Sequence, residues 1–177
     1  MATTYRLTLT CSDRSGLVAS VTGLLFDLGG NLGDTTFAVY GTEAEFTTLV
    51  DLPMAVSADD IRGEVSGLGL PPGARIDVAP FEGPASPGPM GRVTHVITLS
   101  GGDQPGLIAR LAEVFGQFGA NIVHLDAGPD RGPGPRGQYA TRFSVALDEA
   151  TAATCLATVA NTAESLHLEC NWETANS

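Results

Sequence analysis

An internal repeat constrains the fold of this chain more than any other feature of its sequence. The segment CSDRSGLVASV near the N-terminus is matched by GGDQPGLIARL in the second half of the chain. Asp103 stands ninety residues after Asp13, and Gly106 follows Gly16 at the same spacing. Self-similarity at a fixed spacing is typical of a duplicated structural unit. The chain is therefore expected to contain one unit twice.

Each copy of this motif leads into an amphipathic helix. Apolar residues recur at three- and four-residue spacing, which places them on one helix face. After each helix, GGN or GAN supplies a stop, because glycine adopts positive φ without strain. The two apolar stripes share one register: Leu17, Val18, Val21, Leu24, Leu25 and Leu28 in the first copy, and Leu107, Ile108, Leu111, Val114, Phe115 and Phe118 in the second.

Alternating apolar and polar runs predict the strands. A second helix and a last strand complete each copy, and Ser57 is a predicted N-cap with Asp60 three residues on. The order strand–helix–strand–strand–helix–strand is that of the ferredoxin-like split βαβ arrangement, an antiparallel sheet with both helices on one face. The fold class is therefore α+β, with two such units. The first three strands are expected over 5–11, 32–41 and 45–52, and again over 95–101, 122–128 and 141–147.

The later parts of the two copies are expected to correspond after one insertion and one deletion in loops. The insertion of seven residues falls in AGPDRGPGPRGQ, and the deletion falls around LGLPPGA. The predicted pairs of equivalent residues are Phe46 with Phe143, Ile76 with Leu166, and Val78 with Leu168.

These observations divide the chain into two domains joined by a linker. The segment PFEGPASPGPMGR is rich in proline and glycine and has no apolar period. We therefore predict a first domain over 1–80, a linker over 81–92 and a second domain over 93–177. A single unit of this size supports only a marginal core, which side-by-side pairing of two units would relieve.

The charge of the chain argues against a nucleic-acid partner. Twenty acidic residues outweigh nine cations, all of them arginine, and the net charge is -11. Binding to a phosphate backbone depends on cations that displace counterions. The three cysteines, Cys11, Cys155 and Cys170, are odd in number and lack metal-ligand spacing. They predict thiols in a reducing compartment rather than a disulfide framework.

The sequence also lacks membrane and secretion signals. It contains no run of about 18 apolar residues, so neither a transmembrane helix nor a membrane partner is expected. The segment MATTYRLTLT lacks a basic region followed by an apolar stretch, so no secretory signal is expected. We therefore expect a cytoplasmic protein.

The repeated segments CSDRSGLVASVTGLLFDLGGNL and LSGGDQPGLIARLAEVFGQFGANI resemble the opening of the ACT domain, a small ligand-binding regulatory module. Two such domains without a catalytic domain resemble the glycine cleavage system transcriptional repressor group. The first copy is also similar to the N-terminal domain of formyltetrahydrofolate deformylase, whose catalytic portion would need more residues than remain. The resemblance implies side-by-side domains in a continuous sheet, an amino acid bound at their interface, a transcription-factor partner and a possible homodimer.

By this resemblance, the loop from the first strand into the first helix contributes much of the ligand site. The asparagines that begin the second strands are expected to lie close to that loop. A helix N-terminus suits a carboxylate, because unpaired N–H groups and the positive end of the dipole meet there. Asparagine offers a donor and an acceptor to an amino acid. The matching residues are Asp13, Arg14, Ser15, Gly16, Leu17 and Asn31, and in the second copy Asp103, Gln104, Pro105, Gly106, Leu107 and Asn121.

A purely structural interpretation of these residues stays open. The aspartates would then cap their own helices, the glycines would allow close helix–sheet packing, and the asparagines would hold left-handed turns. The copies also differ, because Ser15 stands where the second has Pro105, which suits the first helical position. Ala120 likewise replaces Gly30. Either change would leave one site degenerate.

Catalysis is not expected. His95, His124 and His167 have no metal-ligand spacing, and His95 and His167 fall on predicted strands. The sequence has no phosphate-binding glycine loop and no defensible Ser-His-Asp or Cys-His order, so neither metal nor cofactor is predicted. An RNA-recognition module would need aromatic residues on its open sheet face, where the first strand carries Arg6 and Thr8.

The sequence thus predicts a non-catalytic regulatory protein that binds an amino acid or a similar small metabolite. The alternative is a protein–protein interaction module that senses no ligand. A sensor predicts a polar site beside Asp13 or Asp103, whereas an interaction module predicts loops filled by their own side chains. The role of the loop 127–138, rich in glycine and proline, stays open.

Overall fold

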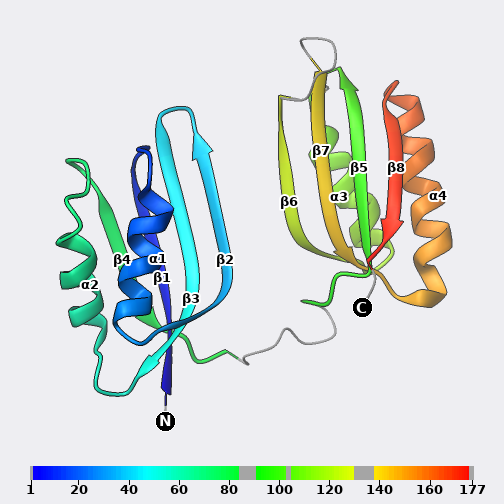
Figure 1. Cartoon of the computed structure of the whole chain (residues 1–177). Helices are drawn as coiled ribbons and strands as arrows, with labels where there is room; N and C mark the ends of the chain where they lie inside the picture. The colour runs from blue at the N-terminus through cyan, green and yellow to red at the C-terminus, as the bar shows by residue number, and fades with distance from the viewer. Residues whose placement is uncertain (1, 84–90, 103–104, 130–137, 176–177) are drawn as a thin grey trace. The chain divides into compact units, whose positions relative to one another are not determined.

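The chain forms two compact units, Met1–Gly83 (unit 1) and Pro84–Ser177 (unit 2). Each unit consists of a sheet and two helices (Figure 1). The structure is a computed structural model, and it describes residues 2–83, 91–102, 105–129 and 138–175.

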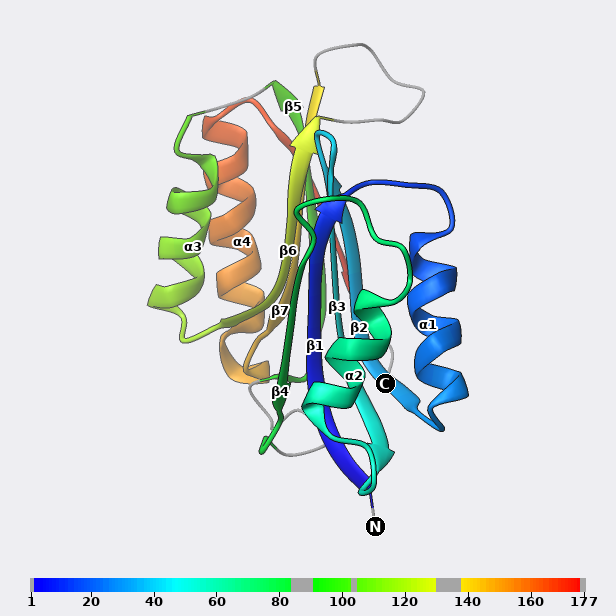
Figure 2. The same cartoon turned by 90° about the vertical axis from the view of Figure 1, so that its left-hand side faces the viewer.

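Unit 1 is a four-stranded antiparallel sheet with both helices on one face (Figures 1 and 2). The strand order is β2-β3-β1-β4, so β2 and β4 are the edges. This architecture confirms the predicted ferredoxin-like order. The elements are β1 (Ala2–Ser12), α1 (Leu17–Asp27), β2 (Asn31–Tyr40), β3 (Glu43–Pro53), α2 (Ala58–Ser66) and β4 (Arg75–Pro80).

Unit 2 repeats this architecture. Its antiparallel strands follow the order β6-β7-β5-β8, and both helices again cover one face (Figure 2). The duplication that the ninety-residue repeat predicts is therefore present. The elements are β5 (His95–Gly102), α3 (Leu107–Gln117), β6 (Asn121–Pro129), β7 (Gln138–Ala146), α4 (Glu149–Ser165) and β8 (Glu169–Thr174).

The core of each unit lies between the sheet and its helices. From Tyr5 to Cys11 of β1 every second residue is buried, as the alternation predicts. The helix stripes bury Leu17, Val21 and Leu25 in α1 and Leu107, Leu111, Val114 and Phe115 in α3. Val18 and Ile108 differ from the prediction, because these residues at the margin of the stripes are 37% exposed. The two cores share no residue.

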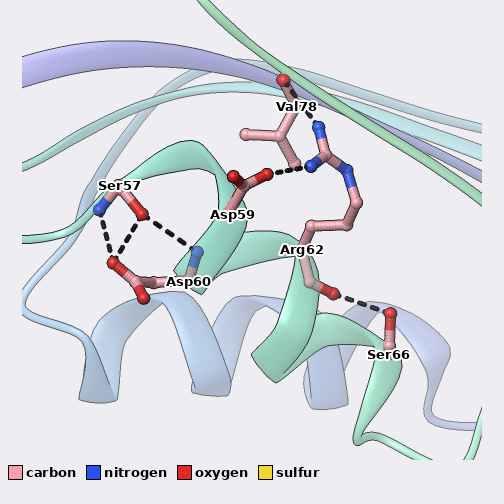
Figure 3. A network of polar contacts seen from close by, with 6 residues as sticks. All are labelled: Ser57, Asp59, Asp60, Arg62, Ser66 and Val78. Atoms are coloured by element: carbon pink, nitrogen blue, oxygen red, sulfur yellow. Dashed lines mark hydrogen bonds and ion pairs between the residues drawn. The ribbon is translucent and has the colours of Figure 1, made fainter.

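The residues at the helix ends adopt the backbone conformations and hydrogen bonds that the sequence predicts. Gly29 and Gly119 adopt positive φ after α1 and α3, as predicted. At α2 the Ser57 hydroxyl accepts a hydrogen bond from the Asp60 N–H, and the Asp60 carboxylate accepts one from the Ser57 N–H (Figure 3). This reciprocal arrangement confirms Ser57 as the N-cap. Arg62 pairs with Asp59 on the same helix.

The third strands correspond in a register that differs from the predicted one. Thr48 faces Leu7 of β1 in unit 1. Phe143 faces Ile97 of β5, the equivalent of Leu7, in unit 2. Phe143 therefore takes the place of Thr48, and the predicted pair of Phe46 with Phe143 is wrong. The reason is the hairpin before the third strand, which is longer in unit 2 by five residues rather than seven.

The predicted correspondence of the last strands is also wrong. Arg75 begins β4 opposite Thr10, whereas Glu169 begins β8 opposite Ser100, the equivalent of Thr10. Helix α4 has 17 residues where α2 has nine, so the start of β8 is displaced along the sequence. The residues 166–168 form the turn after α4 rather than strand, and the positions of Ile76 and Val78 are taken by Cys170 and Trp172. His167 consequently lies in a turn, not on a strand.

Two predictions fall partly outside the described residues. The predicted linker includes residues 84–90, and the loop 127–138 includes residues 130–137. None of the helices in the described part of the chain is long and apolar enough to cross a membrane.

Candidate functional site

The loop between β1 and α1 of unit 1 contains four of the predicted site residues, a fifth, Leu17, begins α1, and the geometry of the loop depends on Gly16. Gly16 has φ +78° and is the N-cap of α1. Gly106 has the same role before α3, with φ +80°. A Cβ added at either glycine would contact nothing within 4 Å. The glycines are therefore required for the left-handed backbone conformation, and not for the close helix–sheet packing that would also explain a glycine there.

The start of α1 receives no side-chain cap. The Asp13 N–H donates to the Thr42 carbonyl at 2.8 Å, but the Asp13 side chain does not cap the helix. The helix has no acidic residue in its first turn. The capping role considered for Asp13 is therefore wrong. The positive end of the α1 dipole is left available to an anion.

Arg14 lies at this helix end and has an unusual set of contacts. Its Nη2 donates to the Leu68 carbonyl, in the turn after α2, at 3.5 Å. Its Nε is buried and has no hydrogen-bond partner among the described residues. The ion pairs among the described residues are Arg62 with Asp59 and Arg142 with Glu173, so the Arg14 guanidinium faces no carboxylate there. An unpaired, part-buried guanidinium is suited to binding a carboxylate or phosphate.

Cys11, at the end of β1, is buried close to these charges. Burial raises the pKa of its thiol, while Arg14 lowers it and Asp13 raises it by smaller amounts. Burial also raises the pKa values of Cys155 and Cys170. The three thiols therefore stay protonated near neutral pH, and none has the thiolate character of a nucleophile.

Asn31 does not join this loop within its own unit. It lies opposite Asp51, which in turn lies opposite Thr4 near the start of β1. The chain from Thr4 to Asp13 runs the length of the sheet, about 30 Å at the usual rise of a strand. Asn121 has the equivalent place in unit 2. The expectation that the asparagines lie close to the loops of their own units is wrong.

In unit 2 the equivalent loop is described in part. Asp103 and Gln104 lie outside the described residues. Pro105 lies in the turn before Gly106, and α3 begins at Leu107, so Pro105 is not the first helical residue that its sequence suggested. Leu107 is buried in the core. Helix α3, like α1, begins without a side-chain cap or an acidic first turn.

The sequence places Arg14 in the predicted site by its position, but it does not reveal that the Arg14 guanidinium contacts a carbonyl far along the chain. The carbonyl that it contacts belongs to Leu68, 54 residues away, and only the packing of α2 beside α1 brings the two together. Among the described residues, no group of three or more His, Cys, Asp or Glu side chains could hold a metal ion.

Comparisons with known proteins agree with this architecture. The ACT domain family model matches residues 95–153, from the first residue of β5 into α4. A crystal structure of an unknown protein from Galdieria sulphuraria has a TM-score of 0.77 at 19% identity and covers 99% of this chain and 100% of its own. The chain has a tandem ACT-like fold.

A second solved structure, of a protein proposed to be a glycine cleavage system transcriptional repressor, has the same tandem ACT-like fold. Its TM-score is 0.61 at 16% identity, and it covers 100% of this chain and 99% of its own. No curated protein matches the sequence. Identities this low establish the fold alone.

Proposed function

We propose that this protein is a non-catalytic regulator that senses a small metabolite with a carboxylate, an amino acid above all, at the β1–α1 loop of unit 1. The observation that carries the proposal is the Arg14 guanidinium. In a chain of net charge -11, it lies part-buried beside a helix N-terminus and faces no carboxylate among the described residues.

The chemistry of the loop matches the two ends of an amino acid. Guanidinium and helix N–H groups both bind carboxylates, and charge-assisted hydrogen bonds are stronger than neutral ones. Asp13 is exposed two residues after the buried Cys11 and offers a carboxylate to an ammonium group. The exposed Ser15 adds a hydroxyl. A catalytic role finds no comparable support among the described residues.

The regulatory part of the proposal rests on the fold and on the repressor-like structural neighbour. A ligand alters a regulator only by its difference in affinity between two states of the protein. We propose that the ligand-bound state is the one that a transcription factor distinguishes, with glycine or one-carbon metabolism as the first system to examine. A cytoplasmic location stays the prediction from the sequence.

The test is a titration of the full chain with a panel of L-amino acids and glycine, followed by thermal unfolding. A ligand at a hundred times its dissociation constant stabilises by about 2.7 kcal/mol. For the variant Arg14→Gln we expect a tenfold to hundredfold loss of affinity, since a hydrogen bond to a charged group contributes about 1.5–3 kcal/mol. Calorimetric titration measures that loss.

Arg6→Gln is the matched control, because Arg6 is an exposed arginine on the open face of β1. It should bind like the wild type. A panel that leaves the unfolding temperature unchanged would favour the interaction module without a ligand. Equal affinity of wild type and Arg14→Gln would contradict the assigned site.

A further inference from the structure

The last strands of the two units, β4 and β8, are edge strands that occupy equivalent places in their sheets (Figure 1). Pro80 of β4 lies opposite Tyr5 of β1. Thr174 of β8 lies opposite His95 of β5, which stands ninety residues after Tyr5. An edge strand presents unpaired N–H and C=O groups to any chain that can add a strand, unless the protein blocks them. The two edges differ in this respect.

The backbone of β4 is blocked along its outer edge. The Phe81 N–H, just beyond the strand, donates to the Thr4 carbonyl of β1 at 2.9 Å. Alternate residues of an antiparallel ladder face the partner strand, so Val78 and Pro80 direct their backbone groups away from β1. Pro80 has no N–H to offer, and the Val78 carbonyl accepts a hydrogen bond from Arg62 Nη2 of α2 at 3.3 Å (Figure 3). An added strand therefore finds few groups to pair with on β4.

The backbone of β8 is open along the same edge. The Ala175 N–H donates to the Thr94 carbonyl, just before β5, at 2.8 Å. By the same alternation, Cys170, Trp172 and Thr174 direct their N–H and C=O groups away from β5. None of the three is a proline, and no side chain of a described residue bonds to their backbone in the way that one does in unit 1. Within the described part of the chain, β8 is thus able to pair with an added strand.

A tryptophan side chain lies at the centre of this open edge. Trp172 points to the same face of the sheet as Ile97, which lies opposite it and is fully buried, yet 47% of Trp172 is exposed. The equivalent Val78 of unit 1 is only 5% exposed. Trp172 is also absent from the buried core of unit 2. Tryptophan is among the residues that contribute most of the binding free energy at protein interfaces, so this exposed side chain suits contact with an added strand.

The other face of β8 is acidic. Glu169, Asn171 and Glu173 alternate with the outward-bonding residues, so they lie on the face of the sheet without helices, and all three are exposed. Glu173 pairs with Arg142 of β7 at 3.6 Å, whereas Glu169 forms no ion pair among the described residues. A second copy of this chain, with its net charge of -11, is repelled from such a surface, and a basic segment is attracted to it. The charge therefore favours a basic partner over self-association.

We propose that β8 binds an extended, basic segment of a partner protein, which adds a strand to the sheet of unit 2. The backbone of the segment pairs with the outward groups of β8, the mode by which peptides extend an exposed sheet edge. Its side chains on the acidic face lie opposite Glu169 and Glu173, which are four residues apart, so its basic residues are also four apart. An apolar residue beside one of them contacts Trp172. The inference does not depend on the metabolite site at Arg14.

The test uses the fluorescence of Trp172, which is the one tryptophan of the chain. The probe is the peptide Thr-Lys-Val-Thr-Val-Lys-Thr with blocked ends, and its control is the same peptide with glutamate in place of lysine. Titration of the full chain with the basic peptide should change the Trp172 emission, with an affinity that falls as the NaCl concentration rises. The acidic peptide should leave the emission unchanged.

The variant Thr174→Pro blocks the edge of β8 in the way that Pro80 blocks β4. Because Thr174 directs its N–H away from β5, the variant should keep the circular dichroism spectrum of the wild type. It should bind the basic peptide about tenfold more weakly, since it lacks one donor and its ring obstructs the added strand. Thr174→Val is the matched control, because it keeps the N–H and should bind like the wild type. Glu169→Gln should weaken binding about threefold and reduce its salt dependence.

An unchanged Trp172 emission with the basic peptide would overturn the inference, and so would equal affinities of Thr174→Pro and Thr174→Val for it. Sedimentation of the protein without peptide tests the remaining occupant, a second copy of the chain. A dimer that dissociates in Thr174→Pro would assign the edge of β8 to self-association and overturn the basic partner. None of these results bears on the proposed metabolite site, which Arg14→Gln tests in unit 1.

Discussion

At the scale of single residues, three helices end in the same hydrogen-bonded turn, but one of them lacks the usual glycine. After α1 and α3 the left-handed residue is Gly29 or Gly119, whereas after α4 it is His167, with φ +57°. The His167 N–H donates to the Glu164 carbonyl at 2.9 Å, and the Leu168 N–H donates to the Ala163 carbonyl at 3.0 Å. These two bonds define a Schellman turn, which glycine forms most easily.

We predict that His167→Gly stabilises unit 2. A side chain in left-handed conformation costs about 1–2 kcal/mol, and part of this is returned when Gly replaces His. Urea unfolding should show a gain of about 1 kcal/mol. The reverse change, Gly119→Ala, should cost about as much, since an added Cβ meets nothing within 4 Å and only the backbone is strained. A loss of stability in His167→Gly would mean that the imidazole makes a contact worth more than the strain.

Close packing around Gly30 explains why unit 1 has glycine where unit 2 has Ala120. A Cβ on Gly30 would lie 2.6 Å from the Leu25 carbonyl oxygen and 2.9 Å from Val50. Unit 2 holds Ala120 at the equivalent position, where its N–H still donates to the Phe115 carbonyl. The difference between Gly30 and Ala120, which the sequence suggested would leave one site degenerate, is therefore explained by the local packing in unit 1.

At the scale of elements, the second helices differ more than any other pair. Helix α2 has nine residues and begins with the reciprocal bonds of Ser57 and Asp60, whereas α4 has 17 residues and Asp148 as its N-cap. Periodicity predicted that both helices exist, because it is a local property. It did not predict where the following strand begins, because that depends on how helix and loop divide the intervening residues.

The cap of α2 predicts a pH dependence of unit 1. The Ser57 hydroxyl and N–H donate to the Asp60 carboxylate and hold its pKa below the ordinary value of 3.8. Since these bonds favour the charged form, their contribution to stability is complete above about pH 4 and is lost as the pH falls through the lowered pKa.

The advantage of the wild type over Asp60→Ala, measured by urea unfolding, should therefore be constant above about pH 4 and narrow as the pH falls further. Ser57→Ala removes the bond from the Ser57 hydroxyl but keeps the one from the Ser57 N–H, so the advantage of the wild type over this variant should narrow by a smaller amount. An advantage that stays constant or grows toward acid would contradict this assignment of the pKa shift.

At the scale of the whole molecule, the chain combines a large negative charge with few ion pairs. The described residues hold two ion pairs, both with exposed partners, against a net charge of -11 for the chain. Exposed ion pairs contribute little to stability. Screening by salt therefore weakens the repulsion between the acidic residues more than it weakens the attraction within these pairs. The two separate cores, and not surface charge, stabilise the fold.

We predict that salt stabilises this protein. A rise from about 0.01 M to 0.1 M NaCl shortens the Debye length from roughly 30 Å to 10 Å. The unfolding temperature, measured by circular dichroism, should rise over this range, and KCl should act like NaCl if screening is the cause. A falling unfolding temperature would show that attractive pairs dominate the electrostatics.

Local sequence patterns predicted the duplication, the order of the elements and the start and end of the first helix in each unit. These features depend on residues within one or two turns of each other, so spacing reveals them. Which strand residues lie opposite one another became known from the folded sheets alone. Phe143 lies opposite Ile97, Asn31 lies far from Asp13, and the Thr141 hydroxyl has no partner among the described residues. Loop lengths set these pairings across the sheet, and no local periodicity records them.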